Sequence, residues 1–382
     1  MTGNGELSLK LVSVDQQADF CILTWSDGHQ SDFHYVWLRD NCRCSNCLHP
    51  DTKERLFDIL SFDPEIEFTG RLEVQNNELS VKWPDGHESV FGGVWLRDNC
   101  YDDASKASRR EKPILWTSSI KSDLPEIEFE YVVSGDKGLL VWLDLLCDYG
   151  FVLVRNTPTM DGEVTRFAER ISHLRETNFG REFDVISKPN PNNVAYTALE
   201  LQSHSDLPNW ELPPGTQFLH CLEFKAEGGE STLVDGFSVA EQLRGTDSDA
   251  FGLLAQTPIP FRFHDEQWDV RWPSPTFSLD DMGDMREIRF HAALTAPLNI
   301  AASKMLPFYR AYRALTKLVR KPENILRLKL QPGDMLVFNN RRALHGRTAF
   351  DPDSGPRHLQ GCYVDNDDIM SKRRVLRRRL QG

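Results

Sequence analysis

Along its first hundred residues the chain alternates short apolar runs with turn dipeptides. FCILTWSDGH at residues 20–29 and LSVKWPDGH at residues 79–87 each place an Asp-Gly pair directly after a strand-like segment. Asp-Gly is one of the strongest signals for a tight turn between two antiparallel strands. The pattern therefore predicts two similar hairpins, which together form a small all-β module.

The two hairpins belong to an eighteen-residue repeat. WSDGHQSDFHYVWLRDNC at residues 25–42 returns as WPDGHESVFGGVWLRDNC at residues 83–100, 58 positions later. In both copies we interpret the segment WLRD as an aromatic core anchor followed by a local ion pair. Cys100 and His29 are interpreted as structural remnants of the duplication, so the repeat predicts a scaffold rather than a catalytic centre.

Three cysteines follow the first copy in the spacing C-x-C-x2-C, at Cys42, Cys44 and Cys47. Such close spacing disfavours internal disulfides, whereas three thiolates on one tight loop suit a tetrahedral zinc site. The turn histidines His29 and His87 each offer a fourth ligand, and we favour His87 because its copy lacks the cysteine cluster. A site with four protein ligands is closed and therefore structural. Cysteines and turn histidines without a metal are the alternative.

The pattern changes beyond a charged, irregular stretch, and we predict a domain boundary there, with domains at 1–112 and 113–382. Residues 137–150 are predicted to form a helix that ends at a glycine, residues 151–156 a strand, and residues 162–177 a second helix. Later segments are mostly short strand-like runs between proline and glycine, such as TQFLHCLEF, STLVDGF, DMLVFNN and HLQGCYV. The second domain is therefore predicted to be a β-sandwich or barrel flanked by helices, in a β-rich α+β protein.

Charge and cysteine usage narrow the class of protein. Lysine and arginine total 44 against 57 aspartate and glutamate residues, so the formal net charge is −13. This disfavours nucleic acid and anionic membranes as partners, because both attract positive protein surfaces. The N-terminus has no apolar segment, no run of eighteen apolar residues occurs, and most of the eight cysteines are scattered. These features predict a soluble cytoplasmic protein with reduced thiols.

The basic C-terminal run SKRRVLRRRL at residues 371–380 departs from the acidic character of the chain. Helical spacing puts Ile369, Leu376 and Leu380 on one side and the arginines elsewhere. We expect a C-terminal helix that packs in a homodimer, with a nucleic-acid-binding tail as the alternative.

The segment Ser203-His204-Ser205-Asp206 carries the first candidate chemistry. In an extended strand, His204 and Asp206 point to the same face and can bind one ion together. His345 follows a predicted strand far downstream, and a barrel can bring that strand alongside the first. Two histidines and one carboxylate on one face of a metal leave three positions open, as in non-heme Fe(II) oxygenases.

An arginine twelve residues after His345 strengthens this hypothesis. Arg357, Leu359, Gly361 and Tyr363 alternate to one face of the predicted strand RHLQGCYV. A buried guanidinium needs an anion. The distal carboxylate of 2-oxoglutarate would satisfy Arg357 through two hydrogen bonds, while its keto-acid end occupies two open metal positions.

With these residues in place, the chain resembles the gamma-butyrobetaine hydroxylase family of Fe(II)/2-oxoglutarate oxygenases over nearly its whole length. The motifs are WLRDNCRCSNC with WPDGH, ETNFG, NNVAYTALELQSHSDLP, PPGTQFLHCLEFKAEGGESTLVDGF, NNRRALHGR and RHLQGCYVD. The resemblance implies a double-stranded β-helix (jelly-roll) catalytic domain with flanking helices after the small zinc-binding β domain. It also implies hydroxylation of a substrate by O2, with release of succinate and CO2 and with ascorbate as a supporting reductant.

By this resemblance, individual residues receive roles. The Fe(II) ligands would be His204, Asp206 and His345. The 2-oxoglutarate contacts would be Thr232, Leu219 and Arg357. The Zn(II) ligands would be Cys42, Cys44, Cys47 and His87.

The resemblance further implies a small quaternary-ammonium substrate. Family members hold a trimethylammonium group in an aromatic cage, which Phe179, Phe183, Tyr196 and Tyr363 match here. Cation–π attraction suits such a group because it has no N–H to donate. Leu207 stands where animal members carry a tyrosine, which loosens one wall of the cage.

The anionic end of the substrate is less well matched. Asn193 matches an asparagine that contacts the substrate carboxylate, but Ala292 falls near the position of a second one, with Arg289 and His291 close by. The resemblance favours gamma-butyrobetaine, hydroxylated to carnitine. A trimethylammonium phosphonate is the alternative substrate, and a taurine-type oxygenase or a non-catalytic β protein is an alternative class.

Overall fold

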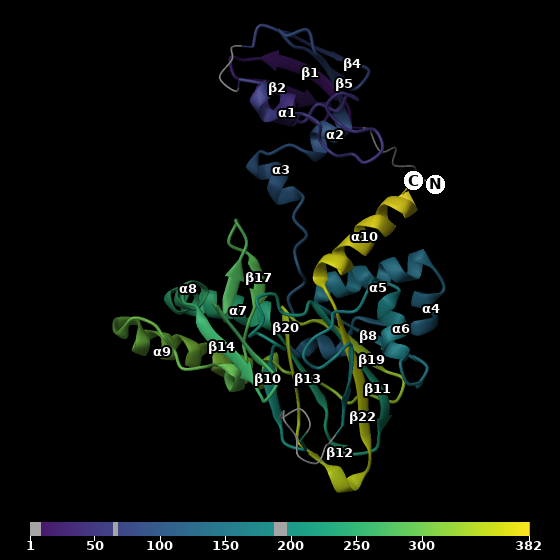
Figure 1. Ribbon diagram of the computed structural model, residues 1–382, viewed down its shortest axis with the longest axis vertical. Helices are drawn as coiled ribbons and strands as arrows, with labels where there is room; N and C mark the ends of the chain where they lie inside the picture. Colours follow the sequence, from purple (N-terminus) through teal and green to yellow (C-terminus); the bar gives the residue numbers. More distant parts are fainter. Residues whose placement is uncertain (1–8, 64–67, 187–196, 382) are drawn as a thin grey trace. The chain divides into compact units, whose positions relative to one another are not determined.

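The computed structural model describes residues 9–63, 68–186 and 197–381 (Figure 1). The chain divides into two compact units between Glu111 and Lys112. We describe each unit separately. Within the described ranges, no helix combines the length and the apolar character needed to cross a bilayer.

The N-terminal unit contains the repeat as two copies of one motif, a three-stranded antiparallel sheet followed by a short helix. Its elements are β1 (Leu11–Gln16), β2 (Phe20–Trp25), β3 (Gln30–His34), α1 (Tyr35–Asp40), β4 (Arg71–Gln75), β5 (Glu78–Lys82), β6 (Glu88–Gly92), α2 (Gly93–Asp98) and α3 (Asp103–Ser108). The predicted hairpin turns are confirmed, because Gly28 and Gly86 both adopt φ +82° between paired strands. Apolar side chains of both copies share one core.

The C-terminal unit is built on two sheets that enclose an apolar core. One sheet has the strand order β7-β8-β19-β11-β22-β9, and the other has the order β10-β20-β13-β18. Their strands are β7 (Glu126–Glu128), β8 (Phe151–Arg155), β9 (Glu182–Val185), β10 (Leu201–His204), β11 (Thr216–Phe224), β13 (Ser231–Asp235), β18 (Leu326–Leu328), β19 (Met335–Asn339), β20 (Ala343–Arg347) and β22 (Arg357–Val364). The β-rich α+β architecture with a double-stranded β-helix, predicted from the sequence, is confirmed.

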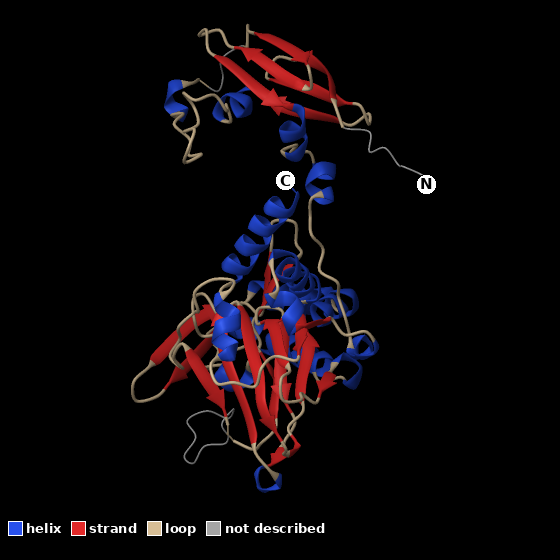
Figure 2. Ribbon diagram, turned by 90° about the vertical axis from the view of Figure 1, so that its right-hand side faces the viewer, coloured by secondary structure: helices blue, strands red, loops and turns tan. Residues whose placement is uncertain are grey.

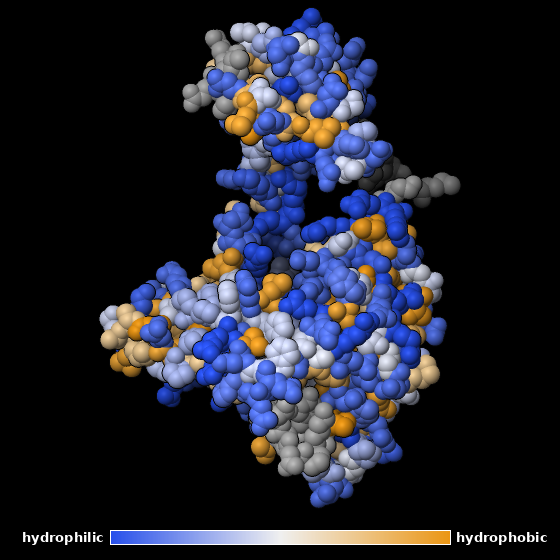
Figure 3. Space-filling model, in the orientation of Figure 1, coloured by the Kyte–Doolittle hydropathy of each residue, from blue (hydrophilic) through white to orange (hydrophobic). Residues whose placement is uncertain are grey.

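Helices and short hairpins surround these sheets (Figure 2). The helices are α4 (Phe129–Val133), α5 (Asp136–Tyr149), α6 (Glu163–Glu169), α7 (Gly236–Thr246), α8 (Ser248–Gln256), α9 (Ala302–Val319) and α10 (Asn366–Gln381). The remaining strands are β12 (Glu227–Gly228), β14 (Ile259–His264), β15 (Asp269–Ser274), β16 (Phe277–Leu279), β17 (Met285–Ile288) and β21 (Phe350–Asp351). Helices α5, α6 and α10 share a core with the six-stranded sheet, and α7, α8 and α9 form a second core beside β13 and β20. The visible surface of the unit is mostly hydrophilic with scattered apolar residues (Figure 3).

Two helices predicted from the sequence are present, but one is shorter than expected. Helix α5 ends at Gly150, which adopts φ +74° as a left-handed cap. Helix α6 covers Glu163–Glu169 and ends well before residue 177. At its end the backbone N–H groups of Arg170 and Ile171 bond to carbonyls only three residues earlier, which tightens and terminates the helix.

The C-terminal helix predicted from the basic tail is confirmed as α10. Ile369 and Leu376 are buried in the core that includes α5, as expected. Leu380, which we placed on the same side of the helix, is 48% exposed. The last turn of α10 lies opposite the polar beginning of α5, where Arg379 pairs with Asp136 at 3.6 Å.

Candidate metal centres and active site

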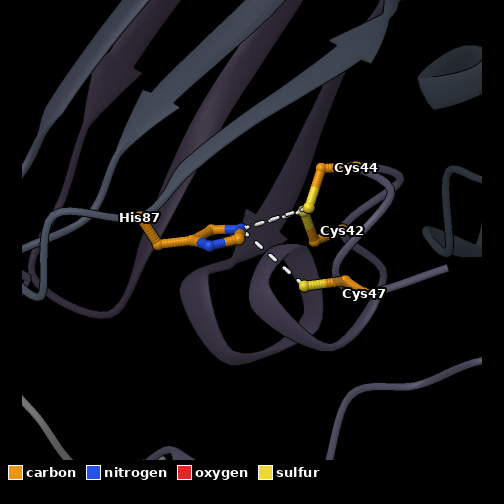
Figure 4. A group of neighbouring side chains, drawn as sticks. All are labelled: Cys42, Cys44, Cys47 and His87. Carbon is orange, nitrogen blue, oxygen red and sulfur yellow. Dashed lines mark hydrogen bonds between the residues drawn. The ribbon is translucent and has the colours of Figure 1, made fainter.

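A cluster of sulfur and nitrogen atoms joins the two repeats of the N-terminal unit (Figure 4). Cys42, Cys44 and Cys47 lie on the loop after α1, and His87 comes from the turn between β5 and β6 of the second repeat. The Nε2 atom of His87 is 3.2 Å from the sulfur of Cys42 and 3.7 Å from those of Cys44 and Cys47. The structure therefore brings His87, and not His29, to the three cysteines. Three thiolates and one imidazole are a donor set that fits zinc.

Neighbouring groups favour the metal-binding forms of the side chains in this cluster. Burial and the nearby Arg39 guanidinium lower the pKa of His87, so its imidazole is neutral, which is the ligating form. Arg39 donates to the sulfur of Cys47 at 3.4 Å, and Ser89 donates to the sulfur of Cys42 at 3.0 Å. Such donors stabilise thiolates around a metal.

The repeated WLRD segment does not form the local ion pair that we predicted. Arg39 pairs with Asp85 of the other repeat at 3.5 Å, whereas its neighbour Asp40 pairs with Arg55 at 2.6 Å. The prediction of a local Arg-Asp pair is wrong, because adjacent helical residues point in different directions.

In the C-terminal unit, His204, Asp206 and His345 lie together. Strands β10 and β20 pair so that His204 lies opposite His345, with ring centroids 4.3 Å apart. Oxygens of Asp206 are 3.2 Å from Nε2 of His204 and 3.6 Å from Nε2 of His345. Two imidazole nitrogens and one carboxylate facing a common point fit a divalent iron with open positions.

The route by which these residues meet differs from the prediction in two respects. β10 ends at His204, so Asp206 lies beyond the strand and not on its face. His345 lies within β20 rather than after a strand. The chain turns directly after Asp206, where Leu207 adopts the left-handed φ of +52°. That conformation costs roughly 1–2 kcal/mol for a residue with a side chain, and such strain is typical of functional sites.

A buried asparagine holds this turn in place. Asn340 accepts a hydrogen bond from the backbone N–H of Asp206 at 2.7 Å and donates to the Asp206 carbonyl at 3.0 Å. It is fully buried and also donates to the Pro214 carbonyl at 3.1 Å. The phenol of Tyr363 donates to the Asp206 carboxylate at 2.7 Å. Asn340 is therefore a positioning residue for the carboxylate.

We expect Asn340→Ala to weaken metal binding by about 10- to 100-fold, the usual cost of losing a group that orients a ligand. Both polar groups of the Asp206 peptide would lose their partner, and the strained turn would relax. Titration with Fe(II) or Mn(II) under anaerobic conditions measures the affinity directly. Asn339→Ala is the matched control, because Asn339 contacts Arg341 and not Asp206. Wild-type metal affinity in Asn340→Ala would remove this role.

Burial keeps two imidazoles beside Asp206 neutral. It lowers the pKa of His345 to about 3 and that of His291 to about 3. The ring of His291 packs on His204 with centroids 4.5 Å apart, and its Nδ1 lies 3.2 Å from the Ser205 carbonyl. Neutral imidazole is the form that binds a metal.

A cavity of about 90 Å³ adjoins the three residues. Its lining includes five of the residues predicted from the sequence, namely Phe179, Phe183, Leu219, Arg357 and Tyr363. The ring centroids of Phe183 and Tyr363 are 5.2 Å apart, and Phe179 lies 5.9 Å from Phe263. Asn193 and Tyr196 lie outside the described residues.

Arg357 lines this cavity as a half-buried cation. Among the residues that the structure describes, no carboxylate forms an ion pair with it, and its Nε donates to the Gly229 carbonyl at 3.3 Å. Its guanidinium lies over Phe224 and Phe350, 5.4 and 5.8 Å from the ring centroids. Burial and the charge of Arg347 lower the pKa of Arg357 to about 10, so it remains charged at neutral pH. A half-buried charge of this kind calls for an anionic ligand.

Thr232 and Leu207, which were predicted to bind a ligand, do not line the cavity beside the metal ligands. Ser231, and not its neighbour Thr232, lines the cavity. Leu207 is 3% exposed and lines neither this cavity nor the second cavity beside the metal ligands. The alternation of side chains along β13 puts consecutive residues on opposite faces, which explains the error at Thr232.

Arg289 has a structural role instead of the predicted contact with substrate. Its side chain pairs with Glu287 at 2.6 Å and donates to the carbonyls of Pro208, Trp210 and Glu211. It lines neither cavity beside the metal ligands. The guanidinium thus fixes the segment that follows Asp206.

A second cavity, of about 520 Å³, reaches His204 and Asp206 from another side. His291 and Ala292 line it, as does Phe263 next to Phe179. Its basic lining residues are Arg262, His264 and Arg320. We did not predict these residues, and no motif marks them. Arg262 and His264 lie on β14 and Arg320 directly follows α9, so they meet only in the folded chain.

Gln217 is a further residue that sequence reasoning missed in the first cavity. It is 2% exposed, and its Oε1 atom has no hydrogen-bond partner among the described residues. Gln217 and Leu219 alternate along β11, so the position of Leu219 predicts that of Gln217.

Comparison with protein families matches both units. Residues 117–363 match the family model described as taurine catabolism dioxygenase TauD, TfdA family. Residues 12–91 match the model described as gamma-butyrobetaine hydroxylase-like, N-terminal.

Several proteins are similar over nearly the whole chain. Gamma-butyrobetaine dioxygenase of Pseudomonas sp. (strain AK-1) is 42% identical over 96% of this chain and 96% of its own length. The Homo sapiens protein of the same name is 32% identical over 94% and 95%. Mitochondrial trimethyllysine dioxygenase of Gallus gallus is 35% identical over 90% and 83%. A solved structure from Burkholderia xenovorans, provisionally named an alpha-ketoglutarate-dependent taurine dioxygenase, aligns with a TM-score of 0.50 at 14% identity over 66% and 92%, a likeness in fold alone.

Proposed function

Because the chain belongs to the gamma-butyrobetaine hydroxylase family of Fe(II)/2-oxoglutarate-dependent dioxygenases, we propose that it hydroxylates gamma-butyrobetaine to carnitine. The hydroxyl group enters at the carbon beta to the carboxylate, and 2-oxoglutarate is converted to succinate and CO2. The observation that supports this most is that one cavity is lined by the metal-ligand cluster, by aromatic rings and by Arg357, which forms no ion pair with any described carboxylate.

Different residues that line this cavity suit different parts of the reaction. His204, Asp206 and His345 would hold Fe(II), which together with 2-oxoglutarate supplies the activation of O2. Arg357 would bind the distal carboxylate of 2-oxoglutarate, and we now assign Ser231 in place of Thr232 as the hydroxyl beside it. The protein itself positions the reacting C–H bond and excludes water.

The aromatic residues supply the recognition of the substrate cation. Phe179, Phe183 and Tyr363 line the cavity within reach of Asp206. A trimethylammonium group gains roughly 0.5–2 kcal/mol from each well-placed ring and needs no hydrogen-bond acceptor. The 42% identity to a gamma-butyrobetaine dioxygenase supports this substrate class.

Succinate release tests the proposal when gamma-butyrobetaine, trimethyllysine and trimethylaminoethylphosphonate are compared side by side. We expect gamma-butyrobetaine to give the highest kcat/KM. A tert-butyl analogue, with carbon in place of the ammonium nitrogen, should bind at least roughly tenfold more weakly, because it loses the attraction of the rings for a cation. If no trimethylammonium compound stimulates turnover, the cage assignment fails.

A phosphonate substrate remains the second candidate because of the second cavity. Arg262 and Arg320 give that cavity cationic donors near His291, His264 adds an imidazole, and Ala292 offers no amide for a carboxylate. A phosphonate carries more negative charge than a carboxylate and suits such donors. Preferred turnover of trimethylaminoethylphosphonate in the same assay would select this candidate.

We further propose that Cys42, Cys44, Cys47 and His87 hold a structural Zn(II). The four donors come from two repeats, so a bound ion would link them within one unit. A closed site with four protein ligands stabilises the fold and touches no substrate.

A further inference from the structure

The N-terminal unit contains a second cluster that mirrors the first. His29 of the first repeat meets Cys100 and Asp102 of the second repeat. The hydroxyl of Ser105 lies 3.3 Å from Nε2 of His29. The repeat offset of 58 positions relates the two clusters residue by residue: Cys42 to Cys100, Cys44 to Asp102, Cys47 to Ser105, and His87 to His29.

The surroundings of the two clusters also correspond. In each, an arginine of the WLRD segment donates to the third cluster residue and pairs with the turn aspartate of the other repeat, and a serine two residues after the histidine donates into the cluster. In the first cluster these contacts are Arg39 to Cys47 at 3.4 Å, Arg39 to Asp85 at 3.5 Å and Ser89 to Cys42 at 3.0 Å. In the second they are Arg97 to Ser105 at 3.4 Å, Arg97 to Asp27 at 3.4 Å and Ser31 to Asp102 at 2.9 Å.

The second cluster has a different set of donors from the first. Hydrogen bonds among its own residues hold it together, so it needs no ion. The carboxylate of Asp102 accepts hydrogen bonds from Ser31 at 2.9 Å and from the backbone N–H of Ser105 at 2.8 Å, and lies 3.5 Å from Nε2 of His29. The thiol of Cys100 is fully buried and donates to the Leu96 carbonyl at 3.5 Å. A protonated thiol and a neutral hydroxyl are poor ligands, and the carboxylate already has partners.

We propose that this second cluster is a latent metal site, closed by hydrogen bonds in the natural chain, and that cysteine at positions 102 and 105 converts it into a second tetrahedral zinc site. The proposal rests on the assignment of zinc to the first cluster. The backbone already presents the histidine, one cysteine and both supporting donors in the arrangement of the first cluster, so only the two missing sulfurs are needed.

Zinc content of the full-length protein tests the proposal. Wild type should hold one zinc per chain and Asp102→Cys/Ser105→Cys should hold two. Cobalt substitution should double the absorption of tetrahedral cobalt thiolate in that variant. The matched control is Asp103→Cys/Lys106→Cys, which adds two cysteines one position further along α3 and should keep one zinc.

Substitution of the histidines provides a test that needs no added cysteine. His87→Ala should lose the zinc of the wild-type protein, whereas His29→Ala should keep it and lower only the thermal unfolding temperature. Two zinc ions in wild type, loss of zinc in His29→Ala, or no more zinc in folded Asp102→Cys/Ser105→Cys than in wild type would each overturn the proposal.

The assignment of zinc to the first cluster can be tested separately from the proposal for the second. Cys44→Ser should reduce the zinc content by one in both the wild-type and the Asp102→Cys/Ser105→Cys background. If wild type holds no zinc but the double variant holds one, the assignment of zinc to the first cluster is wrong and the latent site stands.

Discussion

Asp206→Ala is expected to abolish iron binding and 2-oxoglutarate turnover together. Asp206 is the carboxylate that lies within 3.6 Å of Nε2 of both His204 and His345. Without it only the imidazoles of His204 and His345 remain, and burial lowers the pKa of His345 to about 3, so that ring carries no charge. A divalent iron would then lose one of three protein ligands and the only negative charge among them.

The measurement is anaerobic Fe(II) titration, followed by succinate release in air. Asp206→Asn is the informative companion, because an amide keeps the size of the side chain and an oxygen acceptor for Tyr363 but loses the charge. Asp184→Ala is the control, since that carboxylate pairs with His358 and lies outside the metal-ligand cluster. Iron-dependent succinate formation by Asp206→Ala would contradict the assignment of the metal centre.

The sequence was most informative where structure is local or duplicated. The Asp-Gly turns, the close spacing of three cysteines and the choice of His87 over His29 all follow from the repeat, and the structure brings the predicted four residues together. Recognition of the family is confirmed by matches over both units. Motifs that long preserve the order of elements, so the β-rich α+β architecture could also be predicted.

The sequence was least informative where residues far apart determine a conformation. Asp206 lies beside the histidines just before a strained turn at Leu207. Its backbone is held by Asn340, 134 positions downstream. Nothing in the segment around His204 reveals these hydrogen bonds with Asn340. Arg289 was predicted to meet substrate because it lies close to Ala292, near the position of a family asparagine, yet backbone carbonyls and Glu287 occupy its donors.

The choice between neighbouring residues of one strand also depends on parts of the chain that are far apart in sequence. Thr232 and Ser231 are adjacent, and only the pairing of β13 with β20 and β18 decides which one faces the cavity. A shift of one residue in a strand exchanges its two faces. The strand itself could be predicted from its apolar pattern, but every residue of β13 is buried, so no alternation marks its inner face.

Arg357→Ala is expected to raise the KM for 2-oxoglutarate by about a hundredfold, and to lower kcat less. Truncating one partner of a buried charge pair costs about 2–5 kcal/mol, and each 1.4 kcal/mol is a factor of ten. Arg357 is charged at neutral pH, half-buried over Phe224 and Phe350, and without a carboxylate partner among the described residues. The anion that would neutralise it must therefore come from a ligand.

Two further variants separate charge from geometry in this prediction. Arg357→Lys keeps the positive charge but loses the planar pair of donors, so its KM for 2-oxoglutarate should lie between those of wild type and Arg357→Ala. Arg262→Ala removes an arginine that pairs with Asp269 at 2.8 Å and lines the other cavity, and should leave this KM unchanged. Fe(II) affinity should be the same in all three variants, because neither arginine belongs to the metal-ligand cluster. A wild-type KM in Arg357→Ala would show that another group binds the distal carboxylate, with Arg347 on the same cavity wall as the next residue to replace.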